Sequence, residues 1–209
     1  MSRGEVLTWL KRERLVPVVR APSIGAALQI VDALLEGGIA IVEVTMTVPN
    51  AIEAIREVAK RHPNDVLIGA GTVLDADTAR VCVEAGARFI VSPVVDLPTI
   101  SYCVEAGVVV APGALTPTEI LSAWRAGSDI VKVFPCDAVG GPAYLKAIRA
   151  PLPHIPLMPT GGVTLENVTD FLRAGAVAVG VGGNLVDTKL SREDLVSRAK
   201  AFVDRVRTA

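Results

Sequence analysis

The sequence is poor in cysteine, histidine and aromatic residues. Its three cysteines, Cys82, Cys103 and Cys136, are odd in number and form no CxxC pair. This spacing argues against a disulfide framework and against a zinc site, and it fits a reducing compartment. The two histidines, His62 and His154, stand in turn-like contexts without neighbouring ligand residues. We therefore predict no metal site and assign neither histidine a role.

Excess charge of one sign and long apolar segments are also missing. The chain has 21 Lys+Arg against 22 Asp+Glu, a formal charge of -1, so it lacks the basic footprint of a nucleic-acid or membrane-surface protein. The first 15 residues carry too many charges for a signal peptide, and every apolar run is interrupted before it reaches bilayer-spanning length. We expect a cytoplasmic protein without nucleic-acid or membrane partners.

Apolar residues and glycine are abundant. Apolar residues make up 51% of the 209 positions, which suits one α/β domain over residues 1–209 better than two small domains. Glycine follows helical patterns in the repeated signatures EGG, EAG, EAG, RAG and RAG, which end at Gly38, Gly86, Gly107, Gly127 and Gly175. Glycine ends helices in the left-handed conformation without steric penalty. Because an apolar run follows each signature, helices and strands are predicted to alternate along the chain.

Eight apolar runs are predicted to be strands. They are LVPVVR (15–20), AIVEVTM (40–46), VLIGAGTV (66–73), RFIVSPV (88–94), VVVAPGA (108–114), IVKVFPC (130–136), PLMPTGG (156–162) and AVAVGVGG (176–183). Helical patterns lie between them, several opened by a capping residue such as Ser23, Asp75 or Thr116. Near-continuous apolar strands are typical of a parallel sheet covered on both faces, and eight such units predict a (β/α)8 TIM barrel. An opening helix at about residues 4–13 would cap the bottom of this barrel.

A doubly wound open sheet is the alternative fold. It usually carries a nucleotide-binding fingerprint after one of its strands. The nearest candidate, GAGTVL at residues 69–74, lacks the third glycine and a convincing ribose-binding acid downstream. The barrel is therefore favoured.

Polar residues gather where the predicted strands end, which is where barrel enzymes carry their active sites. Two of them stand out as a carboxylate and an amine, Glu43 and Lys132. Period-two alternation places Glu43 opposite Val42 and Val44, which would face the helices, and it likewise separates Lys132 from Val131 and Val133. Both charged side chains are therefore predicted to point into the barrel.

Two interpretations of this pair remain open. Lysine is seldom buried without a partner, so Glu43 and Lys132 could form a structural ion pair that fixes strand register. Alternatively the burial serves chemistry, because burial of an ammonium group favours the neutral amine, which attacks a carbonyl carbon to form a Schiff base. Glu43 would then be a mobile proton acceptor. The position of both residues at strand ends favours the second interpretation.

Two glycine pairs follow the last two predicted strands, in PTGGV and GVGGN. Glycine lets backbone N–H groups approach an anion closely, and barrels often hold phosphate after strands 7 and 8. We predict a phosphate site formed by Gly161, Gly162, Gly182 and Gly183. Asn184 follows the second pair, and its amide can donate to phosphate.

Taken together, these motifs resemble those of the bacterial 2-keto-3-deoxy-6-phosphogluconate (KDPG) and 4-hydroxy-2-oxoglutarate aldolases. The likeness covers nearly the whole chain. It rests on VPVVR (16–20), EVT (43–45), GAGTVL (69–74), SP (92–93), PGALTPTE (112–119), KVFPxxxxGG (132–141) and PTGGV (159–163). The resemblance implies a class I aldolase that releases pyruvate together with glyceraldehyde 3-phosphate or glyoxylate, as in the Entner-Doudoroff pathway. It implies no metal or other cofactor, and it implies a homotrimer.

The resemblance also implies roles for particular residues. Lys132 would form the Schiff base and Glu43 would shuttle protons. The residues implied to bind the substrate are Arg20, Thr47, Thr72, Pro93, Phe134 and Thr160. Two positions depart from the family pattern, because Thr47 stands where many relatives carry arginine and Asn184 stands where serine is common. Thr72 and Arg20 are implied to hold the substrate carboxylate, and Arg20 would have to compensate for the missing arginine at position 47.

Two other functions are compatible with these motifs. One is a phosphate-binding barrel isomerase or epimerase, which needs an acid/base pair but no covalent lysine. The other is a non-catalytic sensor that binds a phosphorylated keto acid. The motifs also leave the choice between KDPG and 4-hydroxy-2-oxoglutarate open.

Overall fold

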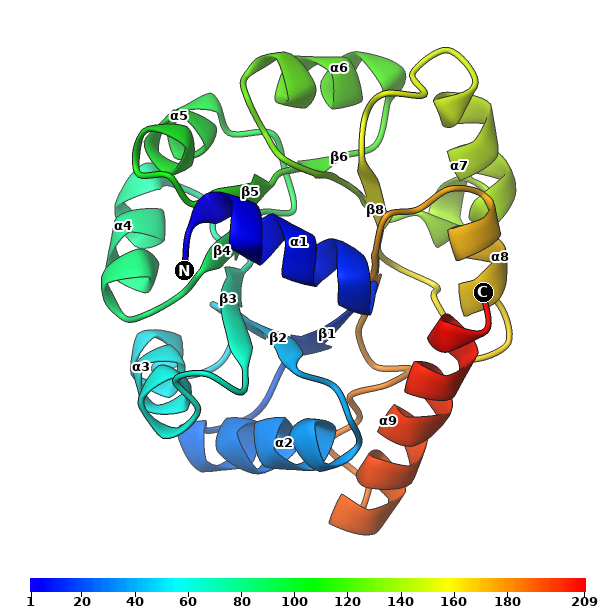
Figure 1. Cartoon of the computed structure of the whole chain (residues 1–209). Helices are drawn as coiled ribbons and strands as arrows, with labels where there is room; N and C mark the ends of the chain where they lie inside the picture. The colour runs from blue at the N-terminus through cyan, green and yellow to red at the C-terminus, as the bar shows by residue number, and fades with distance from the viewer.

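A computed structural model describes all residues, 1–209, as strands and helices that alternate along the chain (Figure 1). The strands are β1 (Leu15–Val19), β2 (Ile41–Thr45), β3 (Leu67–Gly71), β4 (Phe89–Val91), β5 (Val109–Ala111), β6 (Gly113–Ala114), β7 (Val131–Val133), β8 (Leu157–Pro159) and β9 (Val179–Val181). The helices are α1 (Arg3–Glu13), α2 (Ile24–Glu36), α3 (Ala51–Arg61), α4 (Ala76–Glu84), α5 (Leu97–Glu105), α6 (Pro117–Arg125), η1 (Asp137–Val139), α7 (Pro142–Arg149), α8 (Val168–Arg173) and α9 (Arg192–Arg207). Figure 1 shows helices α2 to α9 around the outside of the strands.

The strands pair in parallel in two curled sheets. One has the order β5-β4-β3-β2-β1-β9 and the other has the order β6-β7-β8. A single bridge between Thr160 and Gly180 joins them on one side. On the other side the chain runs from β5 through Pro112 directly into β6. The prediction of an α/β fold with a parallel sheet is confirmed.

The predicted strand at 108–114 is divided into β5 and β6. Pro112 lies at the division, and proline has no N–H to donate to a neighbouring strand. Its carbonyl still accepts a hydrogen bond of 2.9 Å from the backbone N–H of Lys132. The other strands are shorter than predicted because their ends turn into loops. The predicted helix caps Ser23, Asp75 and Thr116 are confirmed, since each side chain accepts a hydrogen bond from the helix that it opens.

Two hydrophobic clusters separate the two faces of the strands. The larger has 52 residues and packs the outward-facing strand residues, such as Val42 and Val44, against the helices. The smaller comprises Val6, Leu10, Val16, Ile41, Leu67, Phe89, Val91, Val109, Ala111, Ile130, Met158 and Ala178. Its strand members come mostly from the N-terminal halves of the strands. They mark the inner face of the sheets.

Helix α1 packs against this inner face at the N-terminal ends of the strands. Val6 and Leu10 of α1 are each 2% exposed within the smaller cluster. Arg3 at the start of α1 donates to the carboxylate of Asp129 at 2.9 Å, and Asp129 also accepts the backbone N–H of Val110. Figure 1 shows α1 lying across the strands.

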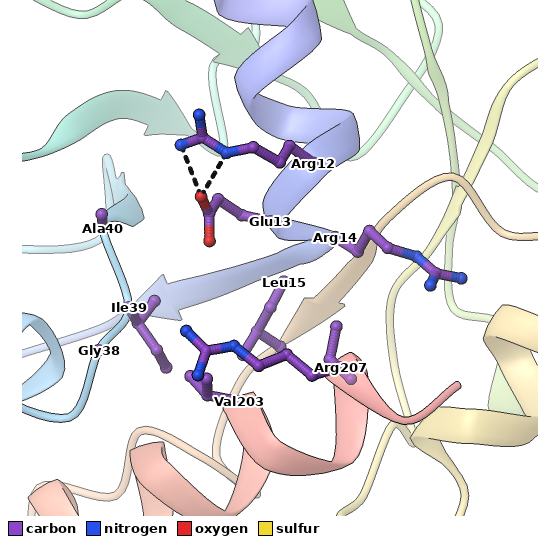
Figure 2. Close-up of a pocket in the computed structure, with 10 residues that line it drawn as sticks. Arg12, Glu13, Arg14, Leu15, Gly38, Ile39, Ala40, Val203 and Arg207 are labelled. Atoms are coloured by element: carbon purple, nitrogen blue, oxygen red, sulfur yellow. Dashed lines mark hydrogen bonds and ion pairs between the residues drawn. The ribbon is translucent and has the colours of Figure 1, made fainter.

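The same N-terminal end carries a surface cavity of about 380 Å³. Its lining includes Leu15 at the start of β1 and the segment 38–40 that leads into β2. Figure 2 shows Arg12 paired with Glu13, while the guanidinium groups of Arg14 and Arg207 point in different directions. None of the site residues predicted from the sequence lines this cavity. No helix in the chain combines the length and the apolar character needed to cross a membrane.

Candidate active site

Because side chains alternate along a strand, residues two positions apart share a face, and the inner face extends from the smaller cluster to the carboxyl ends of the strands. Steps of two residues lead from Val16, Ile41, Val91, Ile130, Met158 and Ala178 to Arg20, Glu43, Pro93, Lys132, Thr160 and Gly182, respectively. The predicted polar residues therefore follow the inner face to its open end. This end lies opposite α1.

Lys132 lies at the centre of β7, between β6 and β8. It is paired in register with Gly113 and Met158 and is only 5% exposed. Its Nζ lies 4.9 Å from the centroid of the Phe134 ring, which is two residues further along the chain. The amine is thus enclosed by the strands, with an aromatic face beside it.

Glu43 lies in β2 and is 1% exposed, and its Oε1 has no hydrogen-bond partner. Burial raises the pKa of Glu43 above its ordinary value of 4.5, while the positive charges of Lys132 and Arg20 act in the opposite direction. Lys132 is therefore near enough to influence the carboxyl group electrostatically. No ion pair or hydrogen bond joins the two side chains, so the structure does not contain the ion pair of the structural interpretation.

Two glycines provide room for buried polar side chains. A Cβ atom on Gly71 would overlap the carboxylate of Glu43, and a Cβ atom on Gly180 would overlap the hydroxyl of Thr160. Thr160 is 7% exposed, and its Oγ1 has no hydrogen-bond partner either. Sequence reasoning gave neither glycine this role. The sequence signal for such a site is a glycine at an inward-facing position of one strand, where the neighbouring strand carries a long or polar side chain.

Thr72, directly after β3, has a strained backbone. Its φ angle is 58°, in the left-handed region that β-branched residues rarely adopt. Such a conformation costs on the order of 1–3 kcal/mol and is concentrated at functional sites in proteins. The strain supports a functional interpretation of Thr72.

The hydroxyl groups of Thr45 and Thr47 are linked at the end of β2. Thr45 is fully buried and donates a hydrogen bond of 3.2 Å to the carbonyl of Val19, next to Arg20. Its Oγ1 also lies 2.6 Å from Oγ1 of Thr47. Arg20 and Thr47 are both exposed, at the open end of the inner face. Sequence reasoning gave Thr45 no separate role, because the link depends on a contact with a neighbouring strand.

The first glycine pair follows β8 and has a fixed conformation. Gly161 and Gly162 have φ angles of 97° and 69°. The amide of Asn167 holds the loop, because its Nδ2 donates to the carbonyl of Gly162 and its Oδ1 accepts the N–H of Thr164, both at 2.8 Å. Glycine is needed here for backbone conformation, whether or not a ligand binds.

The second glycine pair follows β9, and the backbone conformation does not require glycine there. Neither Gly182 nor Gly183 has a left-handed φ angle, and a Cβ atom on either would meet nothing within 4 Å. The packing of the chain therefore does not require glycine at these positions. Asn184 ties the two loops together, because its Nδ2 donates to the carbonyl of Val163 at 2.9 Å. The second hydrogen on that nitrogen remains available.

Cys136 lies near this end but lacks the properties of a nucleophile. It is buried, and burial raises the pKa of its thiol to about 11. The thiol contacts the carbonyl of Gly141. A buried thiol with a raised pKa is inert, so Cys136 fills space at this end.

Comparison with known families identifies the chemistry. The sequence profile described as KDPG and KHG aldolase matches residues 6–201. The chain belongs to the KDPG and KHG aldolase family. Members of this family are lyases, so an aldolase is favoured over the isomerase and sensor alternatives.

Relatives of this aldolase act on two kinds of sugar acid. The chain is 37% identical over 176 residues to 2-dehydro-3-deoxy-phosphogluconate aldolase of Pseudomonas aeruginosa, a match that covers 84% of this chain and 79% of the relative. It is 33% identical over 204 residues to 2-dehydro-3-deoxy-6-phosphogalactonate aldolase of Escherichia coli, with coverage of 97% and 99%.

Solved structures resemble the aldolase over most of its length. KDPG aldolase of Legionella pneumophila, with pyruvate captured as a covalent carbinolamine, superposes with a TM-score of 0.83 at 28% identity, covering 100% of this chain and 98% of that one. A cube-shaped cage designed by fusing symmetric oligomeric domains matches with a TM-score of 0.88 at 33% identity, covering 93% of this chain and 72% of that one.

Proposed function

We propose that this aldolase cleaves 2-keto-3-deoxy-6-phosphogluconate to pyruvate and glyceraldehyde 3-phosphate, and 4-hydroxy-2-oxoglutarate to pyruvate and glyoxylate, through a Schiff base on Lys132. The observation that carries this proposal is an enclosed amine and an unpartnered buried carboxyl group on the same inner face, not bonded to each other. Because neither group is bonded to the other, both are free to contact a bound substrate. The names of the family's members support the substrate class.

The first half of the reaction forms and uses the imine. The neutral amine of Lys132 attacks C2 of the substrate to give a carbinolamine, which takes up one proton from solvent and loses water to give an iminium. The Glu43 carboxylate then takes the proton of the C4 hydroxyl. The C3–C4 bond breaks, its electron pair moves onto the iminium as an enamine, and the aldehyde leaves.

The second half regenerates the enzyme. Protonated Glu43 returns its proton to C3 of the enamine, and water hydrolyses the resulting pyruvate iminium. This releases pyruvate and one proton and restores the neutral amine of Lys132. Burial suits Glu43 to the double role, because the raised pKa makes its carboxylate a stronger proton acceptor.

The phosphate of the substrate would bind at the two glycine pairs. Gly182 and Gly183 support this, because a group that approaches the backbone closely is a reason for glycine that chain packing does not supply. The backbone N–H groups of Gly161 and Gly162, and the second amide hydrogen of Asn184, would add donors. The two loops act together because Asn184 already bonds to Val163.

The keto-acid end would bind on the opposite side of Lys132. The strained Thr72 and the guanidinium of Arg20 would hold the carboxylate, which supplies only acceptors. Phe134 and Pro93 would pack against the carbon chain of the substrate. The unpartnered hydroxyl of Thr160 would line the binding site.

We also propose that residues 1–209 form one domain, a closed (β/α)8 barrel capped by α1, which assembles as a homotrimer. The Thr160–Gly180 bridge and the continuity of β5 with β6 support closure. The packing of Val6 and Leu10 supports the cap. The likeness to a cage built from symmetric oligomeric domains supports an oligomer. Sedimentation equilibrium tests the trimer, and a monomer at micromolar concentration would contradict it.

Borohydride trapping tests the chemistry. The protein is incubated with pyruvate, reduced, digested and analysed by mass spectrometry, and we expect an adduct on the peptide that contains Lys132. Release of pyruvate from each substrate is followed with lactate dehydrogenase. Unmodified protein at saturating pyruvate would contradict the Schiff base, and an adduct without pyruvate release would favour the sensor.

A further inference from the structure

The acidic side chain of Asp137 lies against the first glycine pair. Asp137 opens η1 after the short loop that follows β7, and it is exposed. A Cβ atom on Gly162 would overlap Cβ of Asp137 and lie 3.1 Å from its Oδ2, and a Cβ atom on Gly161 would lie 2.9 Å from its Oδ1. The side chain of Asp137 therefore covers one side of both glycines. Sequence reasoning gave Asp137 no role.

Backbone hydrogen bonds on both sides of Asp137 hold it in this place. The N–H of Cys136 donates to the carbonyl of Thr160 at 3.0 Å, which joins the segment before Asp137 to the residue before the glycine pair. The N–H of Gly140 donates to the carbonyl of Asp137 at 3.3 Å and closes the turn. None of the ion pairs of the chain involves Asp137. Its negative charge is therefore not paired within the chain.

The backbone N–H groups of Gly161 and Gly162 donate to no other backbone group of the chain, so they are free to bind an anion. An anion bonded to them would lie within about 10 Å of the Asp137 carboxylate, because only the N–Cα bond and one side-chain contact separate the two groups. This distance is about the Debye length at 0.1 M ionic strength. A phosphate at the first glycine pair is therefore repelled by Asp137.

The second glycine pair has no acidic neighbour of this kind. A Cβ atom on Gly182 or Gly183 would meet nothing within 4 Å, so no side chain covers these two residues. The neighbouring Asn184 offers a neutral amide donor instead of a carboxylate. A dianionic phosphate is therefore favoured at the second pair over the first.

We propose that Asp137 is a specificity residue that weakens phosphate binding at the first glycine pair and leaves the second pair as the main phosphate contact. The proposal rests on the proposed function, whose phosphate site it divides into two unequal parts. It implies that the charge of Asp137 makes the aldolase distinguish less strongly between acceptor aldehydes with and without a phosphate group.

The test uses aldol addition of pyruvate to glyceraldehyde 3-phosphate and to unphosphorylated D-glyceraldehyde. Asp137→Asn removes the charge and keeps the shape of the side chain. At low ionic strength we expect the ratio of kcat/KM for the phosphorylated over the unphosphorylated aldehyde to rise about 3- to 10-fold, the effect of one charge on a dianion across about 6–10 Å of water. In about 1 M salt, where the Debye length is about 3 Å, the ratio should come within about 2-fold of wild type.

Asp204→Asn is the matched control, because it removes the same charge from an exposed position of α9. The neighbouring Val203 lines the cavity at the N-terminal ends of the strands, so this charge lies away from the glycine pairs. The ratio in Asp204→Asn should equal that of wild type.

Three outcomes overturn the inference. An unchanged ratio in Asp137→Asn would mean that its charge does not reach the phosphate. A lower ratio would mean that Asp137 supports phosphate binding. A rise that persists in about 1 M salt would come from a change of shape and not of charge. Failure of the proposed function is recognised separately, because wild-type protein would then add pyruvate to neither aldehyde.

Inorganic phosphate probes the same site without the reaction. We expect it to compete with glyceraldehyde 3-phosphate, and its inhibition constant should fall by about the same 3- to 10-fold factor in Asp137→Asn. Asn184→Ala should raise that constant about 3- to 10-fold, both alone and combined with Asp137→Asn, because a donor beside the main phosphate contact is lost. An inhibition constant that neither substitution changes would contradict the proposal.

Discussion

The two ends of the strands are built from different kinds of residue. At the N-terminal ends, α1 contributes Val6 and Leu10 to an apolar cluster, and Arg3 forms an ion pair with Asp129. At the carboxyl ends the inner face carries polar atoms without partners, on Glu43 and Thr160, and glycines that make room for them. Buried polar atoms without partners also occur at the first end, on Trp9 and Ser128, but only the second end buries a carboxyl group and an amine on the same inner face. Buried ionisable groups of this kind are expected where a protein must bind and transform another molecule.

We expect the largest effect on activity when the amine of Lys132 is removed. Lys132→Met should lower kcat by about 10⁴-fold or more, because the covalent intermediate is lost. Its free energy of unfolding should stay similar or increase, because an apolar side chain replaces a buried amine. Pyruvate release and urea unfolding check these outcomes. Lys146→Met on the exposed face of α7 is the control, and a borohydride adduct in Lys132→Met would place the imine elsewhere.

Removing the carboxylate should separate imine formation from proton transfer. Glu43→Gln should lower kcat for cleavage by about 10²- to 10⁴-fold, since general base catalysis contributes that much. The imine with pyruvate should still be trapped on Lys132. Failure to trap it in a folded variant would mean that Glu43 is required for the first step as well.

Truncating the apolar end should affect stability instead of chemistry. Leu10→Ala removes a buried side chain from the smaller cluster and should cost about 2–5 kcal/mol of unfolding free energy. Activity per folded molecule should be retained, because Leu10 lies at the end away from Lys132. Urea unfolding and active-site titration with pyruvate and borohydride measure the two quantities. A large fall in kcat would show that the two ends are coupled.

Because burial raises the pKa of Glu43, the free energy of unfolding should depend on pH. The folded chain holds a proton that the unfolded chain releases near pH 4.5. Stability from this group is therefore fully present below pH 4.5 and is lost as pH rises through the folded pKa, at about 1.4 kcal/mol for each pH unit that separates the folded from the unfolded pKa. Glu43→Gln should remove this loss. Unfolding curves from pH 4 upward test it, and parallel pH profiles for the two proteins would contradict it.

The smallest effects should come from two strained residues, one at each end. Arg14, the C-cap of α1, has a φ angle of 61°, and Thr72 has one of 58°. Glycine adopts this conformation freely, so Arg14→Gly and Thr72→Gly should each change stability by only about 1 kcal/mol, in the stabilising direction. Only Thr72→Gly should raise the KM for pyruvate. Equal kinetic behaviour of the two variants would argue against a binding role for Thr72.

Sequence alone predicted what depends on neighbours along the chain. Alternation in β2 and β7 correctly separated Glu43 and Lys132 from the outward valines, and the caps at Ser23, Asp75 and Thr116 follow from local chemistry. Contacts between strands were not predictable. The space at Gly71 and Gly180 and the bond from Thr45 to Val19 depend on which residues meet across the sheet. The φ angle of Thr72 is likewise set by the surrounding structure.

The open surroundings of Gly182 and Gly183 make this loop a practical entry point for protein engineering. Side chains placed there would extend into free space without disturbing their own neighbours. A library at these two positions would therefore sample new chemical groups at the proposed phosphate site while the scaffold stays the same. Aldolases for unphosphorylated acceptors could be sought there first.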